Sequence, residues 1–102
     1  MHASMDKNRI IATLREHQDD LTRQGVLHAA LFGSMARGDA TSESDIDIMI
    51  DTDPEAGHTV YDYVGIKDYI SGLFDIKVDV VNRRGLKPRV RPSVLSEAIH
   101  AF

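Results

Sequence analysis

The stretch LFGSMARGDATSESDIDIMID, residues 31–51, contains the pattern that decides the fold. From Asp45 onward, aspartate and isoleucine alternate along the chain. Side chains two positions apart in a β-strand lie on the same face, so the alternation predicts a strand over 45–50 with one apolar and one acidic face. Neighbouring carboxylates repel one another on such a face, and packing alone therefore does not explain them.

The composition is typical of a single globular domain spanning 1–102, with 42% hydrophobic residues. The chain has no cysteine, no apolar run long enough to cross a membrane and no signal-peptide pattern, so we expect a cytoplasmic protein without membrane association. The formal net charge of −4 argues against direct nucleic-acid binding. Basic residues gather in 83–91, which we interpret as a charged, solvated loop.

Outward from this stretch, apolar residues at helical spacing predict the main helices. The first is expected over about 5–24, with Gly25 ending it in the left-handed conformation. A later helix follows Thr59, which is expected to form a capping box with Asp62. A last helix is expected to carry an apolar stripe made of Leu95, Ala98, Ile99 and Phe102.

Three strands are expected, over 26–32, 45–50 and 76–81, with a short helix beginning at Ser34 after the first. The resulting order is α-β-α-β-α-β-α. It predicts the α/β (α+β) class, with a small mixed sheet of about three or more strands covered by helices on one face.

The second and third strands carry the candidate catalytic residues. If these strands are neighbours, Asp45, Asp47 and Asp79 project from the same face. Three carboxylates this close raise one another's pKa unless cations neutralise them. Mg²⁺ binds carboxylate oxygens together with substrate phosphates, and a pair of such ions can clamp both oxygens of a phosphoryl displacement. We therefore predict these three aspartates as metal ligands.

Gly33 and Ser34 lie where a strand turns into a short helix. A glycine lets the backbone approach a ligand closely, and the free N–H groups of a helix start attract anions. We therefore predict that this pair binds nucleotide phosphates. Arg37 could add a phosphate contact, although an exposed helix arginine is an equally good interpretation.

Each of these residues also has a plainer interpretation. Asp45 and Asp47 could protect an edge strand from aggregation, and Asp79 could be a solvent-facing residue paired with Lys77. Asp51 would share the acidic face if its strand extended that far, but we expect it to begin the next loop. The five histidines show no metal-ligand spacing and are assigned no role.

Gly33–Ser34, ten intervening residues, Asp45-Ile-Asp47 and a later strand residue, Asp79, resemble the signature of the polymerase-β-like nucleotidyltransferase superfamily. The segments GSMARG and SDIDIMID are similar to its minimal nucleotidyltransferase (MNT) branch, which includes antitoxins of HEPN/MNT toxin–antitoxin systems. The resemblance covers about residues 26–81.

The resemblance implies a nucleotidyltransferase palm-like fold and transfer of AMP from ATP, with two Mg²⁺ ions as cofactors. It implies that Asp45 and Asp47 hold both ions and that Asp79 holds one and helps to deprotonate the acceptor hydroxyl. Gly33 and Ser34 would hold the β- and γ-phosphates. In antitoxin relatives, the acceptor is a tyrosine of the partner HEPN-domain toxin, an RNase.

Two other functions remain open from the sequence. The chain could be an antitoxin that neutralises its toxin by binding alone, with a vestigial site, or a nucleotidyltransferase acting on a small molecule. Larger superfamily members carry a second lobe that grips base and acceptor. A chain of 102 residues leaves no room for one, which favours an acceptor supplied by a partner protein.

Overall fold

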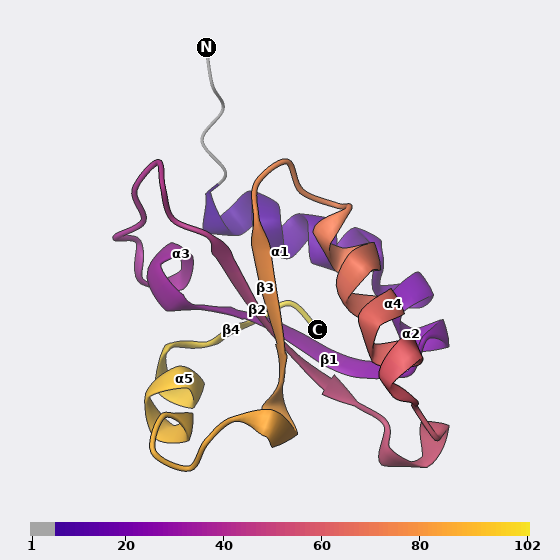
Figure 1. Ribbon diagram of the computed structural model, residues 1–102. Helices are drawn as coiled ribbons and strands as arrows, with labels where there is room; N and C mark the ends of the chain where they lie inside the picture. Colours follow the sequence, from indigo (N-terminus) through magenta and orange to yellow (C-terminus); the bar gives the residue numbers. More distant parts are fainter. Residues whose placement is uncertain (1–5) are drawn as a thin grey trace.

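The computed structural model describes residues 6–102 and contains a mixed four-stranded sheet in the order β3-β2-β1-β4 (Figure 1). β1 pairs antiparallel with both β2 and β4, whereas β2 pairs parallel with β3. The strands are β1 (Val26–Phe32), β2 (Ile46–Thr52), β3 (Val78–Asn82) and β4 (Ile99–His100). The predicted fold class is confirmed, and β1 lies in the interior of the sheet.

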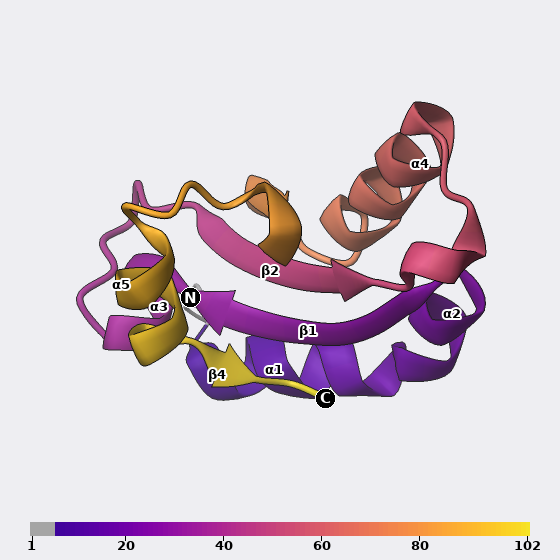
Figure 2. The same ribbon diagram turned by 90° about the horizontal axis from the view of Figure 1, so that it is seen from below.

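Helices fill the connections between the strands. Figure 2 shows α3 and α5 side by side at one end of the sheet and α4 at the other. The helices are α1 (Lys7–Glu16), α2 (Gln18–Arg23), α3 (Gly33–Arg37), α4 (Val60–Ser71) and α5 (Arg91–Glu97), with short 3₁₀ turns η1 (Pro54–Ala56) and η2 (Arg83–Gly85). Among the described residues, no helix is long and apolar enough to cross a bilayer.

One sheet face forms the main core with α1, α2 and α4. The three isoleucines of β2 are fully buried in it, as their alternation with acidic residues predicts. A smaller cluster lies on the opposite face, where Val94 of α5 packs on Ala30 and Met49. The acidic side of β2 is therefore covered in its middle and open at both ends.

The predicted helix signals are largely confirmed. Thr59 and Asp62 form the capping box at the start of α4, with the Thr59 N–H donating to the Asp62 carboxylate at 2.8 Å. Gly25 follows α2 with φ +92°. The first helix is interrupted at His17, whose N–H donates to the carbonyl oxygen of Leu14 at 3.2 Å. The predicted start at Met5 lies outside the described residues.

The last predicted helix is wrong in its second half. α5 ends at Glu97, Ala98 is extended, and Ile99–His100 pairs with β1 as β4. The apolar spacing of this segment fits a helix, but the open edge of β1 offers backbone hydrogen-bond partners that the spacing does not reveal. Ile99 and Phe102 still pack against the main core.

Two strand boundaries also differ from the prediction. β3 begins at Val78 rather than Ile76, which is 37% exposed. β2 continues to Thr52, so Asp51 belongs to the strand instead of beginning the loop. This extension matters for function because it places Asp51 on the same strand face as Met49 and Asp47, which precede it by two and four positions.

Candidate active site

The register of the sheet brings the predicted carboxylates together. Asp47 of β2 lies directly opposite Asp79 of β3 in the parallel pair, and both lie on the face opposite the main core. Asp45 stands just before β2, two positions from Asp47. Asp47 and Asp79 are therefore neighbours across the strand pair, and Asp45 precedes them with its carboxylate toward Lys77.

The negative charges of these groups act on one another. The pKa of Asp47 is raised above its ordinary value of 3.8, first by burial of the carboxyl group and then by the negative charges of Asp79 and Asp45. The Arg37 guanidinium acts in the opposite direction and lowers it. A bound cation would favour the charged form of Asp47, because its positive charge compensates for the lost hydration of the carboxylate and for the repulsion by the neighbouring carboxylates.

Gly33 touches the same carboxylate from the neighbouring strand. It has φ +76°, in the left-handed region, and a Cβ at this position would collide with an Oδ atom of Asp47. The contact arises because Phe32, the residue before Gly33, pairs with Asp47 across β1 and β2. The turn that begins α3 at Gly33 and Ser34 therefore adjoins the carboxylate pair, as the spacing predicts.

Two cations lie at the edge of this site. Arg37 donates from Nη1 to Glu97 at 2.7 Å and from Nε to Asp39 at 3.1 Å. Lys77 lies 3.8 Å from the Asp45 carboxylate. Arg37 thus faces carboxylates of the chain itself, and it would have to leave Glu97 to contact a phosphate.

The carboxylates of the site fit a hard divalent cation whose remaining ligands come from the phosphates of a bound nucleotide. Among residues 6–102, no three His, Cys, Asp or Glu side chains are grouped so as to hold a metal ion by themselves. Asp47 and Asp79 nevertheless offer paired carboxylate oxygens, and Mg²⁺ commonly uses one or two carboxylates together with substrate phosphates. Asp45 would have to turn away from Lys77 to join them.

Sequence reasoning missed Glu97. This residue lies 60 positions from Arg37 in the chain, yet it holds the Arg37 guanidinium and its charge raises the pKa of Asp47. Only the packing of α5 beside α3 brings the two together. No spacing within the sequence could have indicated this contact.

The raised pKa of Asp47 leads to a first prediction. Replacing Asp79 by Asn should lower the pKa of the Asp47 carboxyl toward 3.8 without restoring it fully, because burial, the largest cause, persists. Carbon-detected NMR titration of the Asp47 carboxyl measures this shift. Asp68→Asn, on an exposed part of α4, should leave the titration unchanged, and an equal shift in that control would contradict the assignment.

Comparisons with known proteins agree with this geometry. The family described as Nucleotidyltransferase domain matches residues 11–100. The chain is 35% identical over 89 residues to a protein of Methanocaldococcus jannaschii provisionally named a protein adenylyltransferase, covering 85% of this chain and 89% of the relative. It is 30% identical over 99 residues to the protein adenylyltransferase MntA of Thermococcus cleftensis, covering 96% and 98%.

Solved structures show the same fold. A structure provisionally described as a minimal nucleotidyltransferase superposes with a TM-score of 0.78 at 36% identity, covering 96% of this chain and 98% of the other. A toxin-antitoxin crystal structure with AMP-PNP superposes with a TM-score of 0.67 at 21% identity, covering 96% and 73%. Sequence, fold and site geometry lead to one conclusion: the chain is a nucleotidyltransferase and belongs to the nucleotidyltransferase domain family.

Proposed function

We propose that this nucleotidyltransferase transfers AMP from ATP to a protein hydroxyl and acts as the antitoxin of a toxin–antitoxin pair. The acceptor we propose is a tyrosine of a HEPN-domain RNase toxin. One observation carries the catalytic part of this proposal: the Asp47 carboxylate lies opposite Asp79 and against the Gly33 turn. The names of a relative, protein adenylyltransferase MntA, and of a structural neighbour, a toxin-antitoxin with AMP-PNP, support the acceptor class.

Each residue of the site has a separate role in this proposal. Asp45 and Asp47 would hold two Mg²⁺ ions, and Asp79 would hold one of them. When bound, the ions neutralise phosphate charge and stabilise the oxygens that attack and leave. The backbone N–H groups at Gly33 and Ser34, with the Ser34 hydroxyl, would hold the β- and γ-phosphates.

The transfer itself is a displacement at phosphorus. The acceptor hydroxyl oxygen forms a bond to the α-phosphorus, the bond to the bridging oxygen of the β-phosphate breaks, and pyrophosphate leaves. Asp79 would help to remove the hydroxyl proton, a role supported by its position directly opposite Asp47 in the sheet. The protein contributes mainly position and charge, as phosphoryl transfer requires.

Arg37 provides a second prediction. If its guanidinium leaves Glu97 for a phosphate, Arg37→Ala should weaken binding of Mg²⁺·ATP by roughly tenfold, the size of one hydrogen bond to a charged group. The urea midpoint should change little, because the ion pairs of Arg37 are exposed. Calorimetric titration measures the affinity. Arg23→Ala, which breaks another exposed ion pair, should leave the affinity for Mg²⁺·ATP unchanged. Equal affinities in the two variants would show that Arg37 does not contact the nucleotide.

The acceptor is tested directly by label transfer. The chain is incubated with Mg²⁺, ATP labelled at the α-phosphate, and the product of a neighbouring reading frame. We expect the label on a tyrosine of that partner, and no label after Asp45→Asn/Asp47→Asn. If the doubly substituted chain still neutralises the toxin and binds it with unchanged affinity, the chain is an antitoxin that acts by binding alone. Label on a small molecule instead would show a different acceptor class.

A further inference from the structure

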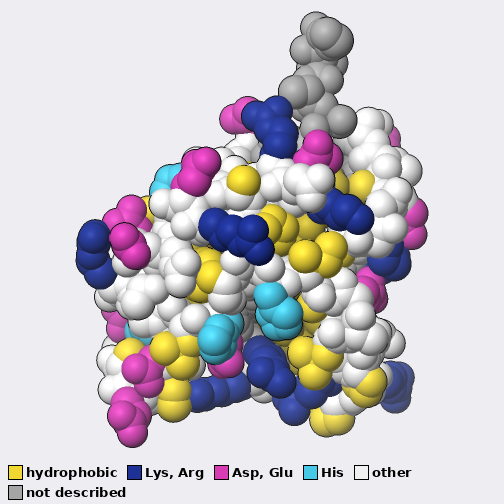
Figure 3. Space-filling model, turned by 180° about the vertical axis from the view of Figure 1, so that it is seen from behind, with side chains coloured by type: hydrophobic (Ala, Val, Ile, Leu, Met, Phe, Trp, Pro, Cys, Tyr) yellow, Lys and Arg dark blue, Asp and Glu magenta, His cyan; other side chains and the backbone are white. Residues whose placement is uncertain are grey.

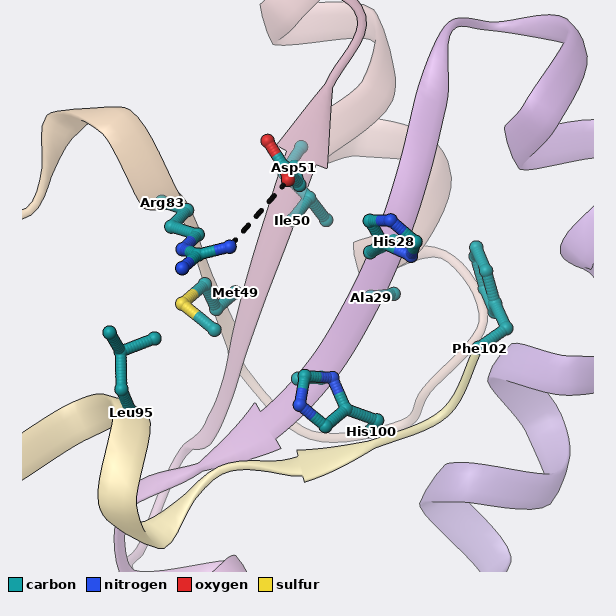
Figure 4. Close-up of a pocket in the computed structure, with 10 residues that line it drawn as sticks. His28, Ala29, Met49, Ile50, Asp51, Arg83, Leu95, His100 and Phe102 are labelled. Atoms are coloured by element: carbon teal, nitrogen blue, oxygen red, sulfur yellow. Dashed lines mark ion pairs between the residues drawn. The ribbon is translucent and has the colours of Figure 1, made fainter.

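A second group of polar residues lies on the same sheet face as the carboxylates. Across the sheet, His28 of β1 is directly opposite Asp51 of β2, and Arg83 of η2 lies 3.9 Å from the Asp51 carboxylate. His100 of β4 pairs with Ala30, two positions from His28 on the same strand. Figure 4 shows His28 on β1 and His100 on β4, with the Asp51–Arg83 ion pair across the sheet from them.

These side chains surround a cavity of about 520 Å³. Ala30 and Met49 contribute apolar surface to it, and Leu95 and Phe102 complete its walls. The cavity is distinct from the carboxylate site, because Val94 packs over Met49 between them. Asp51 and Asp47 are four residues apart on β2, so the two sites lie roughly 13 Å from each other.

The exposure of the two histidines is unusual for their position. β1 lies in the interior of the sheet, yet His28 is exposed, as is His100. In the described part of the chain, α5 covers the middle of this face through Val94, and the two histidines beyond it stay exposed. The structure therefore leaves an open, partly apolar groove with imidazole and guanidinium groups on its rim.

The rim next to the groove is basic. Residues 83–91 contain five of the twelve Lys and Arg residues of the chain, and 83–96 contain no acid. Figure 3 shows Lys and Arg side chains gathered along the lower edge of this face, below two histidines. Among the ion pairs of the described residues, only Arg83 from this segment takes part. Arg84, Lys87 and Arg89 are exposed and have positive charge available.

We propose that this groove binds an acidic segment of the acceptor protein that also carries apolar side chains, an inference that rests on the proposed function. The apolar walls accept side chains, and the cations of 83–91 attract carboxylates at the rim. RNA fits less well, because aliphatic side chains such as Met49, Ile50 and Leu95 form much of the lining, whereas RNA is recognised mainly by phosphate contacts and by stacking of its bases on aromatic groups. Docking here would hold the partner while its hydroxyl reaches Asp47 and Asp79.

The test uses a defined probe, a fluorescein-labelled octapeptide of alternating Glu and Leu, and fluorescence anisotropy. The whole chain carries Asp45→Asn/Asp47→Asn and no ATP is present, so failure of transfer chemistry cannot affect the result. Arg84→Glu/Lys87→Glu should weaken binding by about tenfold, as two lost charge contacts imply. His28→Glu, which places a carboxylate inside the groove, should weaken it as well.

The matched control is Lys7→Glu/Arg9→Glu, which makes the same change in net charge on α1, behind the other sheet face. It should leave peptide binding unchanged. Absence of peptide binding, equal loss in the control, or tighter binding of an octauridylate RNA would each overturn the proposal. With the acceptor protein itself, Arg84→Glu/Lys87→Glu should raise KM and leave kcat unchanged, as a docking site remote from the chemistry requires.

Discussion

Replacing Asp47 by Asn should abolish nucleotide transfer and at the same time stabilise the folded chain at neutral pH. We expect kcat to fall by roughly 10³-fold, because one preorganised electrostatic contact is commonly worth 10²–10³ and Asp47 is the contact that would join both metals. The stability gain follows from the raised pKa of this carboxyl group. The fold disfavours its charged form, and a neutral amide of the same shape avoids that penalty.

The stability gained by Asp47→Asn should depend on pH. A carboxyl whose folded pKa is raised contributes stability that is present below its unfolded value of 3.8 and is lost as pH rises through the folded value. The advantage of Asp47→Asn should therefore be present at neutral pH and vanish below about pH 3.8. Urea unfolding at both pH values measures it.

Asp51→Asn is the matched control, since Asp51 lies on the same strand and face. It should retain kcat, with any change confined to the KM for the acceptor, because Asp51 lines the groove and pairs with His28 across the sheet, whereas Asp47 pairs with Asp79. Transfer that survives Asp47→Asn, or falls equally in both variants, would remove Asp47 from the chemistry.

Gly33→Ala should disable the site by a steric route. The new Cβ would collide with the Asp47 carboxylate, so the carboxylate or the turn must move. Displacing a reacting group by about 1 Å can cost about 10²-fold in rate. The left-handed backbone at φ +76° adds about 1–2 kcal/mol of destabilisation.

Gly38→Ala separates these two effects. Gly38 also has a left-handed backbone, at φ +83°, but a Cβ there meets nothing within 4 Å. Both variants should lose stability in urea unfolding, Gly33→Ala at least as much as Gly38→Ala because of the added collision, whereas only Gly33→Ala should lose transfer. Equal activities in the two variants would show that the contact between Gly33 and Asp47 has no role in positioning.

The local parts of this site could be predicted from the sequence. The alternation after Asp45 defines which face is acidic, because strand side chains alternate without exception inside a regular strand. The Thr59–Asp62 capping box and the turn at Gly33 are also local, since they join residues a few positions apart. For the same reason, the predicted order of helices and strands over residues 7–82 agrees with the structure, except that the first helix is divided into α1 and α2.

The remaining features depend on contacts between distant segments. β4 forms because Ile99 and His100 find the open edge of β1, and Glu97 reaches Arg37 only through the packing of α5 on α3. The groove at His28 combines residues from β1, β2, η2 and β4, none of which has a distinctive spacing. Long-range pairing of this kind has no periodic signature in the sequence.

The central claim is that one triphosphate lies on the Gly33–Ser34 turn while its metals contact Asp47 and Asp79. Adding Mg²⁺ with a non-hydrolysable ATP analogue, and comparing the backbone amide NMR shifts with those produced by Mg²⁺ alone, tests it directly. We predict that the amide signals of Gly33, Ser34, Asp47 and Asp79 all shift with the same dependence on nucleotide concentration. Shifts at the two aspartates with no nucleotide-dependent shift at Gly33 and Ser34 would contradict the claim.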